Sequence, residues 1–143
     1  MKKMNGVITA LITPFKDKKV DFDSLKKLVD FQIKSGVQGF VINGTTGESP
    51  TVSLEEMSEI FSAIRKQVGN AFPLIFGAGS NSTQKAIALS KAGEKLGADA
   101  ILSVVPYYNK PTQKGLFEHF VAIASSINIP VILYNVPGRT ITA

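Results

Sequence analysis

The chain has 143 residues and a net charge of +5, with 44% hydrophobic residues, 19% charged residues and no cysteine. This composition is typical of one globular domain with a real core, and it excludes a disulfide framework and a thiolate metal site. The basic residues form no stripe interleaved with aromatic residues, and no apolar run is long enough to span a bilayer. We therefore expect a single domain over residues 1–143 in the cytoplasm, with no nucleic-acid or membrane partner.

The predicted elements alternate between strand and helix along the chain. Apolar runs predict strands over residues 7–12, 39–42, 73–76, 100–105 and 130–134. Apolar periodicity predicts four helices between them, the first capped by Asp21 or Asp23, the second beginning at Ser53, the third over about residues 82–96 and the fourth containing residues 116–124.

A strand–helix repeat of about thirty residues is typical of βαβ units and of a parallel α/β sheet. Two architectures fit this pattern: an open doubly wound sheet, or part of a (β/α)₈ TIM barrel. A complete barrel takes about 250 residues. Five strands and four helices would therefore form slightly more than half of one.

The segment Gly44-Thr45-Thr46-Gly47-Glu48-Ser49 is the leading candidate for a functional loop. It runs from the end of an apolar strand to a helix start, where Ser53 and Glu56 form a capping box. Ligands bind at the carboxyl ends of parallel strands, and adjacent hydroxyls between glycines suit a small carboxylate or phosphate. The alternative is an ordinary connection, because glycine, threonine and serine are common loop residues.

The loops after the later strands carry further candidates. Tyr134 closes an apolar strand, so its ring is predicted to be buried, and with Thr45 nearby it would form a hydroxyl chain that moves a proton. Arg139 follows Pro137-Gly138 in a rigid turn and is placed to hold a carboxylate. The alternatives are a core tyrosine with a satisfied hydroxyl and a solvated arginine.

Other motifs carry less weight. Tyr107 and Tyr108 lie in a proline-flanked loop that suits a subunit interface. His119, the only histidine, neighbours Glu118 and is predicted to be solvated, and a lone histidine cannot build a metal site. Gly77-x-Gly79 lacks the third glycine of a dinucleotide fingerprint. We expect neither a metal nor a cofactor.

Four motifs in order carry a resemblance to a known family: Ala10-Leu11-Ile12-Thr13-Pro14-Phe15, the segment at residues 44–49, Pro106-Tyr107-Tyr108-Asn109-Lys110-Pro111 and Tyr134-Asn135-Val136-Pro137-Gly138-Arg139-Thr140. From about Gly6 onward the chain resembles the 4-hydroxy-tetrahydrodipicolinate synthase (dihydrodipicolinate synthase) family of class I aldolase-like lyases. The related N-acetylneuraminate lyases share the threonine–glycine loop and the strand-end tyrosine. The Gly138-Arg139 pair resembles the synthase branch.

The resemblance implies the amino-terminal part of a (β/α)₈ barrel in a homotetramer built as a dimer of dimers. Pyruvate would form a Schiff base with a lysine and condense with L-aspartate-4-semialdehyde, in lysine biosynthesis through the diaminopimelate pathway. Thr46 would bind the pyruvate carboxylate, and Arg139 would hold the semialdehyde carboxylate. Thr45, Tyr134 and Tyr108 would form a proton relay, with Tyr108 reaching in from a neighbouring subunit.

One departure from the family pattern concerns the Schiff-base lysine, which belongs to a sixth strand. None of the lysines present ends an apolar strand, where burial would lower a lysine pKa. The chain therefore resembles the amino-terminal half and is expected to be inactive alone. The rival hypotheses are a catalytically incomplete half-barrel that binds ligands or assembles, another pyruvate-dependent aldolase, and an open sheet that binds phosphate at Gly44–Gly47.

Overall fold

The computed structural model describes residues 4–140, and its main feature is a five-stranded parallel sheet. The strands are β1 (Ile8–Ala10), β4 (Gly39–Ile42), β5 (Leu74–Gly77), β6 (Ala100–Val104) and β7 (Val131–Tyr134). They lie in the order β1-β4-β5-β6-β7, and each neighbouring pair is parallel. A doubly wound sheet reverses its strand order, whereas here spatial order follows chain order throughout. The partial barrel is therefore confirmed, and the open doubly wound sheet is wrong.

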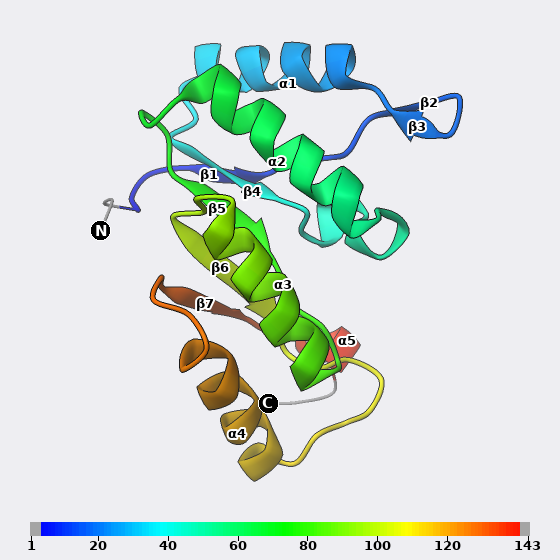
Figure 1. The fold of residues 1–143 in the computed structure, drawn as a ribbon, viewed down its shortest axis with the longest axis vertical. Helices are drawn as coiled ribbons and strands as arrows, with labels where there is room; N and C mark the ends of the chain where they lie inside the picture. The colour runs from blue at the N-terminus through cyan, green and yellow to red at the C-terminus, as the bar shows by residue number, and fades with distance from the viewer. Residues whose placement is uncertain (1–3, 141–143) are drawn as a thin grey trace.

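Four long helices, α1 (Phe22–Lys34), α2 (Leu54–Val68), α3 (Thr83–Lys95) and α4 (Gln113–Ala124), follow one another in a row beside the strands (Figure 1). Side chains cap them as the sequence predicts: Asp21 accepts from the Ser24 N–H, and Ser53 and Glu56 form the capping box. Ser82 caps α3. None of the described helices is long and apolar enough to cross a membrane.

The two faces of the sheet are covered unequally. Side chains alternate between the faces along each strand, and one set, including Phe40, Phe76 and Ile101, is fully buried against the helices. The Phe61 ring of α2 meets the Phe76 ring edge-on, with centroids 5.7 Å apart. In the alternate set Leu102 and Val104 are only half-buried, whereas Ile75 is buried. The face toward the helices is therefore the packed core, and the other face is less completely covered.

Three local features differ from the sequence prediction. The first strand covers only Ile8–Ala10, and a small antiparallel hairpin follows it, formed by β2 (Phe15–Lys16) and β3 (Lys19–Val20). The hairpin turn places Asp17 and Lys18 at φ values of 51° and 63°, the left-handed region that such turns require. The predicted rigid turn around Arg139 is a short helix, α5 (Pro137–Thr140).

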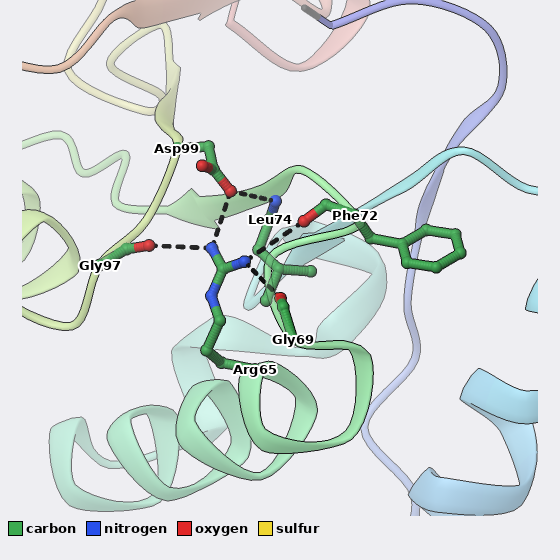
Figure 2. Close-up of polar contacts among 6 residues, drawn as sticks. All are labelled: Arg65, Gly69, Phe72, Leu74, Gly97 and Asp99. Atoms are coloured by element: carbon green, nitrogen blue, oxygen red, sulfur yellow. Dashed lines mark hydrogen bonds and ion pairs between the residues drawn. The ribbon is translucent and has the colours of Figure 1, made fainter. Parts of the chain in front are cut away.

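One cation joins three segments at the end of the sheet opposite the strand carboxyl ends (Figure 2). Arg65, in the last turn of α2, donates hydrogen bonds to the carbonyl oxygens of Gly69, Phe72 and Gly97 and forms a 2.7 Å ion pair with Asp99. The Asp99 carboxylate also accepts the N–H of Leu74 at the start of β5. Arg65 thus holds together the end of α2, the start of β5 and the turn that precedes β6.

Replacing Arg65 by methionine should destabilise the fold strongly. Asp99 would lose its cationic partner and three carbonyl groups would lose a donor, at a cost of roughly 2–4 kcal/mol in the free energy of unfolding. Urea unfolding followed by circular dichroism measures this, with Lys66→Met as the control because Lys66 is the exposed neighbour on the same helix. Equal losses of stability in the two variants would contradict the assignment.

Candidate active site

The predicted functional loop folds into two consecutive single turns of 3₁₀ helix. They cover Thr45–Gly47 and Ser49–Thr51, and Glu48 joins them with a left-handed φ of 56°. The Gly44 carbonyl accepts the N–H groups of Gly47 at 3.0 Å and Ser49 at 3.4 Å. Gly44 and Gly47 are buried, whereas Thr45 and Thr46 are exposed. The first turn therefore presents two threonines to solvent from a backbone that is itself packed.

Asn43 connects this loop to the core. It has a left-handed φ of 59°, is 2% exposed, and its amide donates to the Met57 carbonyl on α2. A Cβ atom at Gly77 would lie 2.3 Å from the Asn43 carbonyl oxygen, so the end of β5 has room only for glycine. The strand ends of β4 and β5 are therefore held backbone against backbone.

The loops that follow β5 and β6 are also held by close backbone contacts. A Cβ at Gly79 would lie 2.3 Å from the Val104 nitrogen, and the Asn109 amide donates to the Asn81 carbonyl at 3.0 Å. Tyr108, between Tyr107 and Asn109, has a φ of 74° and is 90% exposed. This loop projects the Tyr108 side chain away from its own chain.

A cavity of about 340 Å³ opens at the carboxyl ends of the strands, and its lining includes Thr45, Ser49, Lys85, Tyr107 and Tyr134. Thr45 and Tyr134, which come from different strand ends, therefore share one cavity. The expectation that the Tyr134 ring is buried is wrong: it is 36% exposed, because β7 pairs on one side only in the described sheet.

The structure does not bring the other predicted site residues into this cavity. Thr46 lies on the same turn as Thr45 but is not among the residues that line it, and Tyr107 rather than Tyr108 contributes to the wall. Arg139 is exposed on α5. Sequence reasoning also missed Asn43, whose buried amide could have been suspected only from its place before Gly44.

His119 does not lie in solvent, and that expectation is corrected. It is 5% exposed, and its Nδ1 lies 2.9 Å from the Thr83 hydroxyl at the start of α3. Burial against α3 lowers the pKa of the imidazole below its usual 6.5, because the charged form is poorly solvated there. Within residues 4–140, no three potential metal ligands gather around it or elsewhere.

Comparison with known proteins places these features in a family. The profile described as "Dihydrodipicolinate synthetase family" matches residues 3–143. The 4-hydroxy-tetrahydrodipicolinate synthase of Bdellovibrio bacteriovorus is 59% identical over 143 residues, which are 100% of this chain and 49% of that protein.

Solved structures agree with the sequence relatives. The chloride-inhibited dihydrodipicolinate synthase of Acinetobacter baumannii in complex with pyruvate superposes with a TM-score of 0.93 at 50% identity, over 96% of this chain and 48% of that chain. A monomeric dihydrodipicolinate synthase variant superposes with a TM-score of 0.92 at 47% identity, over 94% of this chain and 45% of that one. The chain thus spans about half the length of the relatives it matches.

The buried imidazole predicts a pH-dependent stability. Well above pH 6.5 His119 is neutral in both the folded and unfolded states and adds no pH dependence. As the pH falls through 6.5, the unfolded chain takes up a proton first, because the pKa is lower in the folded state, so stability falls. The slope is at most about 1.4 kcal/mol per pH unit for one group. Urea unfolding between pH 8 and pH 5 measures it.

His119→Gln is the matched variant, because it keeps a polar side chain opposite Thr83 but does not titrate. His119 is the only histidine in the sequence, so the variant should flatten the curve just below pH 6.5. An unchanged slope would show that the imidazole is not responsible.

Proposed function

Because the chain belongs to the dihydrodipicolinate synthetase family, we propose that it supplies the amino-terminal half of the active site of a 4-hydroxy-tetrahydrodipicolinate synthase. This lyase condenses pyruvate, held as a Schiff base, with L-aspartate-4-semialdehyde in the cytoplasm, as a step of the diaminopimelate route to lysine. The observation that carries the proposal is the cavity at the strand carboxyl ends, whose lining includes both Thr45 and Tyr134. In a barrel enzyme this face holds the chemistry.

Thr46 is proposed to bind the pyruvate carboxylate. The Thr45–Gly47 turn exposes the Thr46 side chain while its flanking glycines stay buried. A hydroxyl on a fixed turn donates to a carboxylate with little loss of conformational entropy. Lys85 lines the neighbouring cavity, and its positive charge favours an anionic ligand at this end of the sheet.

Thr45 and Tyr134 are proposed to move the proton that the condensation requires. A tyrosine hydroxyl both donates and accepts a hydrogen bond, and so does a threonine hydroxyl. Both side chains line one cavity that is open to solvent. Tyr134 would deliver the proton to the substrate, and Thr45 would relay it onward.

Tyr108 is proposed to complete this relay in a neighbouring subunit of a homotetramer built as a dimer of dimers. Its 90% exposure and its position outside the cavity of its own chain support action in another subunit. One solved relative is described as a monomeric variant, so the assembly of this chain needs its own measurement.

Arg139 is proposed to bind the carboxylate of the semialdehyde at the mouth of the site.

The Schiff-base lysine is proposed to come from outside this sequence. Among residues 4–140, no lysine lies on the five-stranded sheet, and Lys85, in the first turn of α3, is the one lysine that lines the cavity. A nucleophilic lysine needs a lowered pKa, which burial at a strand end provides. The relatives, about twice as long, have room for such a strand.

Borohydride trapping tests where the lysine lies. The 143-residue chain incubated with pyruvate and borohydride should gain no covalent pyruvate adduct by mass spectrometry, because among residues 4–140 no lysine lies on the five-stranded parallel sheet. The Acinetobacter baumannii relative serves as the positive control for the trapping reaction. A stable adduct on the chain, on Lys85 for example, would overturn this part of the proposal.

Tyr134→Phe tests the proton donor in this chain joined to the carboxyl-terminal half of the Bdellovibrio bacteriovorus relative, of which the chain covers 49%. The substitution removes one hydroxyl from a ring that is already partly exposed, so the fold should persist. Loss of general acid catalysis should lower kcat by roughly 10²–10⁴-fold, whereas the yield of the pyruvate adduct trapped by borohydride should change much less. A kcat of Tyr134→Phe equal to that of the wild type would refute the relay. If the unsubstituted protein instead released pyruvate from N-acetylneuraminate, it would belong to the other aldolase branch.

A further inference from the structure

A hydrogen bond between the first strand's loop and the threonine turn has no part in the function described so far. Thr13, three residues beyond β1, is 5% exposed, and its hydroxyl donates to the Gly47 carbonyl at 2.7 Å. The contact joins residues 34 apart in sequence. A short hydrogen bond away from solvent holds its partners in one geometry, because an unpaired carbonyl there is costly.

The backbone on both sides of this hydrogen bond is closely packed. A Cβ atom at Gly47 would lie 3.1 Å from the Leu11 carbonyl oxygen and 3.3 Å from the Thr13 hydroxyl oxygen. The Leu11 N–H in turn donates to the Val41 carbonyl of β4, at 3.0 Å. The Thr45–Gly47 turn therefore rests directly on the segment that follows β1.

The other end of the turn is fixed independently. Asn43, just before Gly44, donates to the Met57 carbonyl of α2, and the Gly44 carbonyl accepts the Gly47 N–H, which closes the turn. Thr13 is therefore the side chain that fixes the far end, at Gly47, just after the proposed carboxylate ligand Thr46. A fixed Gly47 carbonyl limits how far the backbone that carries Thr46 can move, and so limits where its side chain starts.

We propose that Thr13 is a positioning residue for substrate binding: its hydroxyl holds the Gly47 carbonyl and so orients the Thr46 hydroxyl toward the pyruvate carboxylate. The proposal rests on the function proposed above. Thr13 does not touch the substrate itself. It acts through the turn, and the alternative is a hydrogen bond that only stabilises the fold.

The test compares Thr13→Val and Thr13→Ser in this chain joined to the carboxyl-terminal half of the Bdellovibrio bacteriovorus relative. Valine matches threonine in shape but cannot donate, so we expect the KM for pyruvate to rise on the order of tenfold, with a smaller change in kcat. Serine keeps the hydroxyl, so its KM should stay near that of the wild type. An unchanged KM in Thr13→Val, or an equal rise in Thr13→Ser, would overturn the proposal.

Thr9→Val is the matched control for stability. The Thr9 hydroxyl, on β1, donates to Oε1 of Gln32 on α1 at 2.6 Å, away from the turn. This variant should lose thermal stability and keep the KM for pyruvate of the wild type. If Thr9→Val raises the KM as much as Thr13→Val does, general loosening of the fold explains both, and the proposal fails.

Gly47→Ala disturbs the Thr13–Gly47 contact from the side of the turn. It keeps the test decisive if Thr13→Val does not fold. Its added methyl would push against Leu11 and Thr13, so the KM for pyruvate should rise as well, and an unchanged value would overturn the proposal. Wild-type protein that does not consume pyruvate would overturn the proposed function together with this inference. If the wild type consumes pyruvate but Thr13→Val and Gly47→Ala leave its KM unchanged, only this inference is overturned.

Discussion

The arrangement of the site depends on the close approach of backbone to backbone at the strand carboxyl ends. Gly77 and Gly79 leave no space for a side chain, since a Cβ at either position would lie 2.3 Å from a backbone atom of the neighbouring strand end. Such contacts are stiff, because main-chain atoms cannot move aside as a long side chain can. The threonine turn after β4 and the cavity wall of β6 are therefore placed relative to each other through β5.

The two ends of the sheet have different roles, as in barrel enzymes generally: residues at the amino ends of the strands stabilise the fold, and residues at the carboxyl ends form the site. At the amino ends of the strands, the Arg65 guanidinium is almost fully used by carbonyl groups and by Asp99, so little of it remains to bind a ligand. At the carboxyl ends, Thr45 and Thr46 are exposed and Tyr134 faces a cavity. Polar groups that are satisfied internally hold the fold, and those that face solvent remain available to bind a substrate.

The sequence predicted what depends on local chemistry. The capping box of Ser53 and Glu56 locates a helix start because its hydrogen bonds span only three residues. The apolar runs located five strands, and their spacing indicated a parallel arrangement. The carboxyl ends of parallel strands all lie at one edge of a sheet, so placing Thr45 and Tyr134 on one face followed from the parallel arrangement alone.

What the sequence did not predict depends on packing between distant segments. His119 looks solvated beside Glu118, yet α3 covers it and Thr83 meets its ring nitrogen 36 residues away in sequence. The hairpin turn at Asp17 and Lys18 lacks the usual glycine, so its left-handed backbone leaves no compositional signal. Tyr134 was expected to be buried because it ends an apolar strand, but its exposure is set by the neighbours of β7. At the carboxyl ends, tight backbone contacts between distant segments likewise set the positions of the loops, and they bring Thr45 and Tyr134 to one cavity.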